Sequence, residues 1–304
     1  MIVASSSDVT VRRFDSSEGN VWKYVFEYKG EKPAVAEAVL YRYGSFQKRT
    51  VVCCSVQSGC PVGCTFCGTG NNFIRNLTYI EIVEQVRRVF ANQGLSMTAL
   101  EECEKLQIMF MSMGEPFLNY PQVKKAIKKL AELYPNAQLL VSTIAPNKQK
   151  HLVDFIALAK ELPQVGLQFS LHAANEGDRQ CIIPYKHKLS LAEMRDYGVQ
   201  WWHETGRKPY LNYCIPEDFN WHDVMSCRDL FPPNVFCFTF SVICSSDENM
   251  KDAGYRDLER IRQIEATFAN LGYDTRVFDP AGQDDIGGGC GQLWWVQRHL
   301  QKKG

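Results

Sequence analysis

From residue 50 onward, short and continuously apolar runs alternate with longer amphipathic stretches. The apolar runs cover residues 50–56, 106–113, 137–143, 165–171, 209–215, 235–243 and 273–278. Strands that are apolar on both faces are typical of a parallel sheet covered on both sides. Helical patterns separate the runs at residues 82–90, 120–134, 147–161, 190–205 and 255–271. The chain therefore predicts strand–helix–strand units in an α/β fold, either an open doubly wound sheet or a barrel.

Local signals support this division of the chain. Thr78 followed by Glu81 predicts a capping box at the start of the first helix, and Gly94 predicts its end. Before residue 50, residues 23–30 and 34–43 predict a small β hairpin. No long linker or internal repeat divides the 304 residues. We therefore expect an N-terminal β extension, residues 1–49, on one catalytic domain, residues 50–304.

Charge and composition limit the classes of function. Lys and Arg together number 34, as do Asp and Glu, so the basic surplus typical of nucleic-acid binders is missing. No apolar run approaches the roughly 18 residues that span a bilayer, and the start lacks the order of a secretory signal. We expect a cytoplasmic protein without a membrane partner. Its 12 cysteines are then packed, reactive or metal-binding rather than paired in disulfides.

Three of these cysteines, Cys60, Cys64 and Cys67, form a C-x3-C-x2-C pattern in the loop after the first apolar run. Loops at the carboxyl ends of parallel strands carry the chemistry of such folds. A structural zinc site needs four protein ligands, so zinc would have to borrow Cys54 or a distant histidine. A 4Fe–4S cluster on three thiolates leaves one iron with an open position that a small molecule can fill. The spacing alone leaves both alternatives open.

With Phe66 directly before the last cysteine, the pattern resembles that of the radical S-adenosylmethionine (SAM) superfamily. Further segments resemble, in the same order, the RlmN/Cfr-type RNA adenosine methyl synthases: residues 53–86, 111–120, 141–146, 169–191 and 283–293. Members of that family methylate carbon 2 or carbon 8 of adenine in ribosomal RNA, and in some cases in tRNA. The resemblance implies a partial (β/α)6 barrel, a 4Fe–4S cluster on Cys60, Cys64 and Cys67, and SAM on the fourth iron.

The resemblance also assigns residues that bind SAM. Gly114 and Glu115 match the family's GEP motif for the SAM amino group, and a carboxylate beside a glycine suits an ammonium ligand. Further positions that contact SAM in the family match Ser142, Ser170, Leu171 and His172. Each of these residues, taken alone, also has an ordinary structural explanation, such as a strand-end turn or a hydrogen-bonded imidazole.

Two further cysteines and a glutamate match catalytic positions of the family. Cys290 matches the cysteine that accepts a methyl group from one SAM, and Cys53 matches the cysteine that resolves a covalent protein–RNA intermediate. An adenine amidine carbon is electron-poor, so a carbon radical can add to it although it cannot attack the SAM methyl. The resemblance implies that a 5′-deoxyadenosyl radical takes hydrogen from S-methyl-Cys290, that the methylene radical adds to the base, and that Cys53 then forms a disulfide with Cys290. Glu37 matches an acidic residue that could take the proton, although a glutamate in an edge strand is more often solvated.

The remaining cysteines are assigned to packing: Cys54, Cys103, Cys181, Cys214, Cys227, Cys237 and Cys244. Three departures from the family pattern bear on the substrate. Only about twenty residues precede the region of Tyr24, where family members carry a helical domain, so we expect a short form without that RNA-docking element. Asp279 and Gly282 stand where the family has arginines, which removes positive charge near the substrate. The strand end whose asparagine holds SAM reads FTFSVIC here, with Ser241 as the candidate substitute.

Three hypotheses for the function follow. The first, which we favour because the machinery suited to adenine is retained, is a compact methyl synthase acting on RNA. The second is the same chemistry on a small molecule such as a free nucleoside, nucleotide or biosynthetic intermediate. Both imply an electron donor such as flavodoxin or ferredoxin, and a thiol reductant. The third is an iron–sulfur or zinc binding module without catalysis, which predicts that SAM is not cleaved.

Overall fold

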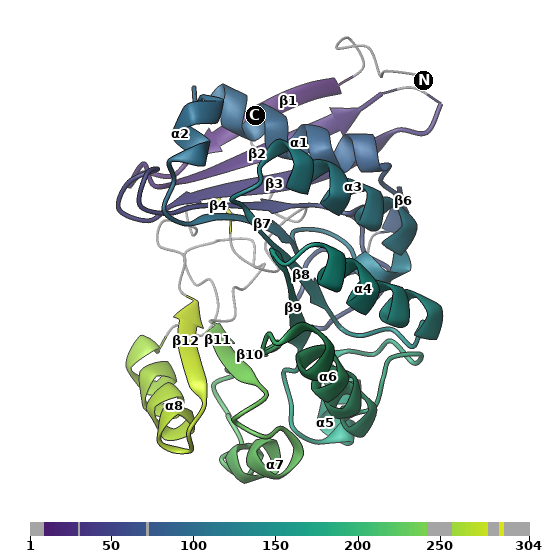
Figure 1. Cartoon of the computed structure of the whole chain (residues 1–304), viewed down its shortest axis with the longest axis vertical. Helices are drawn as coiled ribbons and strands as arrows, with labels where there is room; N and C mark the ends of the chain where they lie inside the picture. The colour runs from purple at the N-terminus through teal and green to yellow at the C-terminus, as the bar shows by residue number, and fades with distance from the viewer. Residues whose placement is uncertain (1–8, 30, 71–72, 242–256, 279–285, 289–304) are drawn as a thin grey trace.

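A single curved sheet organises the part of the chain that the computed structural model describes, residues 9–29, 31–70, 73–241, 257–278 and 286–288 (Figure 1). Within these residues the sheet has ten strands. In spatial order they are β1 (Val9–Asp15), β2 (Val21–Tyr28), β3 (Ala34–Arg42), β4 (Thr50–Cys54), β7 (Leu106–Phe110), β8 (Gln138–Thr143), β9 (Val165–Ser170), β10 (Tyr210–Cys214), β11 (Cys237–Ser241) and β12 (Asp274–Phe278). Strands β1 to β4 pair antiparallel, and all pairs from β4–β7 to β11–β12 are parallel. A separate hairpin consists of β5 (Gln57–Gly59) and β6 (Phe73–Asn76).

Helices connect the parallel strands and lie on the outer side of the sheet (Figure 1). They are α1 (Tyr79–Asn92), α2 (Met97–Glu101), the 3-10 helix η2 (Pro116–Leu118), α3 (Tyr120–Leu133), α4 (Gln149–Glu161), α5 (Glu176–Ile182), α6 (Leu191–Thr205), α7 (His222–Leu230) and α8 (Leu258–Asn270). The described chain thus forms six strand–helix units from β4 to α8, followed by β12. The predicted partial (β/α)6 barrel is confirmed. No helix in these ranges is long and apolar enough to cross a membrane.

The predicted elements agree closely with the observed ones. All seven apolar runs form strands, and all five predicted helices are present. The capping box is confirmed, because the Thr78 side chain accepts from the Glu81 amide while the Glu81 side chain bonds back to Thr78. Gly94 follows the end of α1 with a φ of +67°. The sequence patterns did not predict β1, the β5–β6 hairpin, α2, η2, α5 and α7, because these elements are short or mix polar and apolar residues without a clear period.

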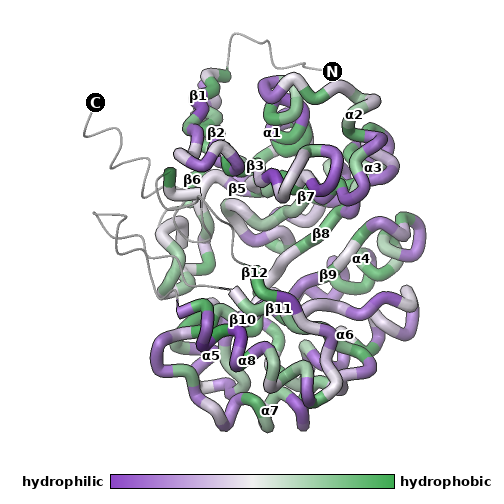
Figure 2. Tube along the Cα trace, turned by 90° about the vertical axis from the view of Figure 1, so that its left-hand side faces the viewer, coloured by the Kyte–Doolittle hydropathy of each residue, from purple (hydrophilic) through white to green (hydrophobic). Residues whose placement is uncertain are grey.

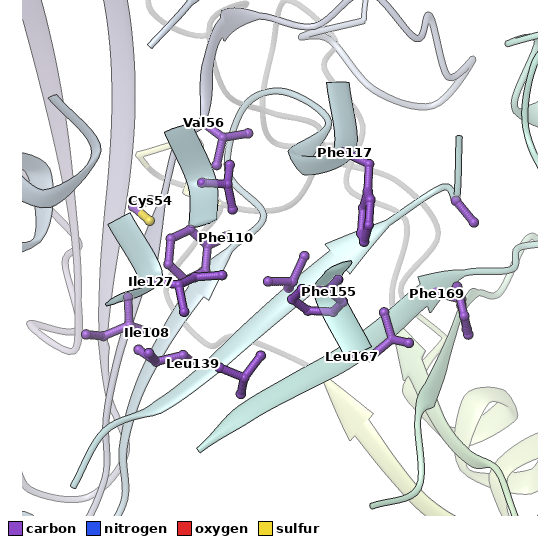
Figure 3. Close-up of a cluster of buried hydrophobic side chains, with 14 of the residues drawn as sticks. Cys54, Val56, Ile108, Phe110, Phe117, Ile127, Leu139, Phe155, Leu167 and Phe169 are labelled. Carbon is purple, nitrogen blue, oxygen red and sulfur yellow. The ribbon is translucent and has the colours of Figure 1, made fainter. Parts of the chain in front are cut away.

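The main hydrophobic core lies between the parallel strands and the helices. Figure 3 shows Ile108 and Phe110 of β7 and Leu139 of β8 beside Ile127 of α3 and Phe155 of α4. Burial of each such side chain contributes about 1.5–3 kcal/mol. Along the helices, hydrophilic and hydrophobic residues alternate (Figure 2), as expected where one face packs on a sheet and the other meets water.

The N-terminal strands continue the same sheet, because β3 pairs with β4. At the other end of the sheet, the ring of Phe278 in β12 meets the ring of Tyr41 in β3 edge-on, with the centroids 6.1 Å apart. The inner faces of the strands from β3 to β12 therefore enclose a space, which we call the lumen.

Candidate active site

The cysteines of the C-x3-C-x2-C pattern lie in the loop between β5 and β6, which follows β4. All three thiols line one pocket, called the cluster pocket below. Residues predicted for SAM binding also line it: Gly114, Glu115, Ser142, Ser170 and His172. These residues follow or end the strands β7, β8 and β9, so the parallel sheet brings together side chains that are far apart in sequence.

The cysteine loop is held by backbone hydrogen bonds. The Cys67 amide donates to the Cys64 carbonyl at 3.0 Å, and the Thr65 amide donates to the carbonyl of Ile182 in α5 at 3.0 Å. Burial raises the pKa of the Cys60 thiol to about 12 and raises that of Cys67 as well. Thiolates at these positions therefore need a compensating positive charge, which iron ions supply.

The cluster pocket fits a 4Fe–4S cluster better than a single metal ion. Within the described ranges, no three His, Cys, Asp or Glu residues converge on one ion position. The three thiols face a shared pocket instead, as required when each thiolate binds a different iron of a cluster.

Glu115 places a buried carboxylate in the wall of the cluster pocket. Its Oε1 accepts hydrogen bonds from Thr143 Oγ1 at 2.6 Å and from the Phe117 amide at 2.9 Å. Its Oε2 accepts from the Ile144 amide at 2.9 Å. Burial raises the pKa of Glu115 to about 7, against the opposing effect of these hydrogen bonds. A cation that reaches the pocket, such as an ammonium group, would offset this cost and favour the ionised form.

The raised pKa of Glu115 predicts a specific pH dependence of stability. Because the folded pKa of about 7 exceeds the ordinary value of 4.5, the folded state binds more protons than the unfolded state between these values. The contribution of Glu115 is therefore most favourable below pH 4.5 and is lost as the pH rises through 7. Relative to Glu115→Gln, the cluster-free protein should lose on the order of 3 kcal/mol over this window, measured by urea unfolding at several pH values. Parallel pH profiles of the two proteins would contradict this expectation.

The other predicted SAM residues occupy strand ends beside Glu115. Ser142 accepts a hydrogen bond from Gln168 Nε2 at 3.2 Å. His172 has a φ of +60°, which is strained for a residue other than glycine. Its Nδ1 accepts from the Cys214 amide at 3.1 Å, and burial lowers its pKa to about 3, so the ring is neutral. The Leu171 side chain packs in the main core rather than in the pocket wall.

Cys53 and Glu37 lie on neighbouring strands next to a buried lysine. Strand β3 lies between β2 and β4, and the Glu37 side chain is 0% exposed, so the alternative of a solvated edge-strand glutamate is wrong. Lys23 Nζ contacts Glu37 Oε2 at 2.9 Å and is also 0% exposed. Cys53 is buried on β4 opposite Val39 of β3, with its Sγ 3.9 Å from the Met109 sulfur.

Cys290 lies outside the described residues, as do Asp279, Gly282 and Cys244. The described segment 286–288 just before Cys290 packs on β2 and β3. Lys23 Nζ donates to the Gly287 carbonyl at 3.3 Å, and Tyr41 Oη donates to the Gly288 carbonyl at 2.7 Å. A Cβ on Gly288 would lie 3.5 Å from Val39 Cγ1, and Val39 is the direct cross-strand neighbour of Cys53.

Several residues around the site were not identified from the sequence. Thr143 and Gln57 hold Glu115, through its carboxylate and its amide. Arg179 is fully buried and donates to the Ile144 and Leu189 carbonyls. Asn212 of β10 lines the cluster pocket and accepts from Ser241 Oγ at 2.7 Å. The sequence signal that could have identified Asn212 is a polar residue inside an otherwise apolar strand.

The packing assignment of the other cysteines is confirmed for those that are buried: Cys54, Cys103, Cys214, Cys227 and Cys237. It is wrong for Cys181, which is exposed, because it lies on the short helix α5 over the cysteine loop.

A parallel partial barrel with three thiols and a buried carboxylate at its strand ends is the arrangement of radical SAM proteins, and comparisons with known proteins agree. A family model described as the Radical SAM superfamily matches residues 54–230. The crystal structure of a radical SAM methyltransferase from Sphaerobacter thermophilus has a TM-score of 0.78 and 28% identity, over 95% of this chain and 82% of that one. Streptococcus suis SuiB bound to S-adenosylmethionine shares the fold at a TM-score of 0.52 and 12% identity, over 77% of this chain and 47% of that one.

Curated relatives carry the name probable dual-specificity RNA methyltransferase RlmN. The Thermus thermophilus protein is 35% identical over 70% of this chain and 57% of its own length. The Carboxydothermus hydrogenoformans protein is 30% identical over 91% of this chain and 77% of its own length, and the Dictyoglomus turgidum protein is 32% identical over 95% and 79%. The chain thus spans little more than half of the Thermus thermophilus protein and over three quarters of the other two.

The chain belongs to the radical SAM superfamily and, within it, to the branch that contains these RlmN relatives. The cofactors of the superfamily are a 4Fe–4S cluster and SAM, and the cluster pocket has the thiols and the carboxylate that suit them.

Proposed function

We propose that this protein methylates an sp2 carbon of adenine, carbon 2 or carbon 8, in RNA. The similarity to relatives named as RNA methyltransferases supports the substrate class. Cys60, Cys64 and Cys67 hold the cluster in this proposal. Gly114, Glu115, Ser142, Ser170 and His172 hold SAM, and Leu171, between the last two, packs in the core behind them. With both bound, the site supplies a 5′-deoxyadenosyl radical.

Cys290 and Cys53 carry the methyl transfer in this proposal. Cys290 takes a methyl group from one SAM molecule and presents its methyl carbon to the base, while Cys53 attacks the Cys290 sulfur and releases methylated adenine. Two thiols become one disulfide in each turnover, and the second SAM accepts the two electrons as it is converted to methionine and 5′-deoxyadenosine. A thiol reductant then restores the pair, and a donor such as flavodoxin or ferredoxin primes the cluster. We place this reaction in the cytoplasm.

The observation that carries the proposal is the position of the segment before Cys290. A Cβ added to Gly288 would lie 3.5 Å from Val39 Cγ1, and Val39 lies directly opposite Cys53. Two residues of chain reach at most about 7 Å further. Glu37, which we assign to the proton transfer, lies on the same strand as Val39, two residues earlier. In this assignment the β extension, residues 1–49, forms one wall of the site, and residues 50–304 carry the cofactors.

Mass analysis of Cys290 tests the proposal. Protein purified without oxygen from cells that supply SAM should carry one added methyl group on Cys290, with four irons and labile sulfide per chain. Cys181→Ala should retain the adduct, whereas Cys290→Ala should lose it and keep the iron. Cys53→Ala should keep the methyl group and accumulate a covalent RNA–protein product.

Two results would count against the proposal. An unmodified Cys290 in wild-type protein would refute the methylcysteine route, and zinc in place of iron would support the non-catalytic alternative. Methylation of free nucleosides, but never of cellular RNA, would reverse the substrate assignment.

A further inference from the structure

Two arginines line a small cavity in the lumen, next to the cluster pocket. The cavity holds about 110 Å³ and is lined by Arg49, Arg276, Tyr43 and Gln168, among others. Met111 and Asn212 line both this cavity and the cluster pocket, so the two spaces adjoin. Neither the cavity nor its arginines have a role in the function proposed above.

Each guanidinium group is stacked on a tyrosine ring, and some of its N–H donors have no acceptor among the described residues. Arg49 lies over the Tyr43 ring at 4.4 Å, and its Nε donates to Gln107 Oε1 at 3.0 Å. Arg276 lies over the Tyr210 ring at 4.1 Å and donates to Thr239 Oγ1 at 2.8 Å and Gln168 Oε1 at 3.2 Å. Among the described residues, both Nη atoms of Arg49 and Nη1 of Arg276 have no hydrogen-bond acceptor. Stacked guanidinium groups with free edges suit planar or tetrahedral oxyanions.

Among the described residues, no acidic side chain forms a salt bridge with the two arginines of this cavity, Arg49 and Arg276. Asp274, on the same strand as Arg276, pairs with Lys208 instead. The two arginines and Lys105 are close enough that both lower the pKa of Lys105, after burial as the main cause. Like charges gathered in a partly buried place are costly unless an anion joins them.

We propose that Arg49 and Arg276 bind a terminal oxyanion group, a phosphate or carboxylate, of a small molecule that extends from the cluster pocket into the lumen. Arg276 also lines a hollow at the opposite ends of the strands, so its side chain separates the two spaces. A cavity of this size can hold the terminal group of a small molecule. It cannot hold an internal phosphate of a polynucleotide, because the chain would have to pass both into and out of the cavity. This small-molecule ligand is additional to the RNA substrate proposed above, and the anion site rests on the lumen geometry alone.

Calorimetric titration of the anaerobically reconstituted protein tests the anion site. The probes are inorganic phosphate, adenosine 5′-monophosphate, adenosine, and a short oligoribonucleotide with one internal adenosine. The monophosphate should bind at least about tenfold more tightly than adenosine, because charged hydrogen bonds contribute this much or more. Inorganic phosphate should compete with it. Arg49→Gln and Arg276→Gln should each abolish the preference for the monophosphate.

A matched variant and further outcomes make the test decisive. Arg195→Gln removes an exposed arginine of α6 that pairs with the adjacent Asp196, and it should leave all four affinities unchanged. If Arg276→Gln does not fold, Arg276→Lys should weaken the preference while keeping the charge. Equal binding of monophosphate and adenosine would overturn the anion site. If the lumen variants weakened only the oligoribonucleotide, the small-molecule assignment would be wrong. Because no methyl transfer is measured, these results are independent of the methylation test on Cys290.

Discussion

Lys23→Met is expected to lower the free energy of unfolding by about 3–5 kcal/mol, because it leaves a buried carboxylate without its partner. Lys23 and Glu37 are both 0% exposed and 2.9 Å apart, so water cannot replace the lost ammonium. The substitution also removes the donor to the Gly287 carbonyl. Urea unfolding of the cluster-free protein measures the change.

Two companion variants separate this effect from a general loss of a lysine. Lys128→Met breaks an exposed pair with Glu161 and should cost no more than about 1 kcal/mol. The double variant Lys23→Met with Glu37→Met removes both charges and should recover most of the stability. A cost for Lys23→Met as small as that for Lys128→Met would show that the buried pair is not a stabilising contact.

Gly114→Ala is expected to destabilise the protein by about 2–6 kcal/mol and to abolish SAM binding. Gly114 has a φ of +96°, and an added Cβ would lie 2.5 Å from Gln57 Cβ and 2.8 Å from the Gln57 amide nitrogen. Overpacking and a strained φ each cost about 1–3 kcal/mol. Gln57 also accepts the hydrogen bond from the Glu115 amide at 2.8 Å, so any movement of Gln57 displaces the carboxylate. Unfolding curves and SAM titration report the two losses separately.

Gly206→Ala is the matched control for Gly114→Ala. Gly206 also has a positive φ, +70°, but no atom lies within 4 Å of an added Cβ. It should therefore cost only the backbone strain, about 1–3 kcal/mol, with unchanged SAM affinity. Equal effects of the two variants on SAM affinity would mean that crowding at Gln57 is unimportant.

The arrangement of the cluster pocket could be predicted to a large extent from the sequence. Buried parallel strands gave clear apolar runs, and motif residues placed at their ends necessarily meet at one edge of the sheet. The resemblance to a known family selected residues such as Glu115 and His172 from many similar ones. Strand periodicity alone would not have distinguished them.

The buried ion pair and the lumen cavity could not be predicted in this way. Charged residues in strands are usually solvated, and Lys23 and Glu37 are buried because residues 286–288, more than 240 positions away, pack over β2 and β3. Arg49 and Arg276 line the same cavity only because the sheet curves until β12 approaches β3. Such contacts depend on closure of the fold, which local sequence patterns do not report.

The N-terminal strands cover one edge of the parallel part of the sheet. β3 covers the hydrogen-bonding edge of β4, the strand that carries Cys53. Without β1 to β3, the backbone amides and carbonyls of β4 would be bare and ready to recruit a strand from another chain. The N-terminal strands thus protect the sheet against self-association. A shortened protein that begins at residue 50 would expose the edge of β4 and would be expected to aggregate.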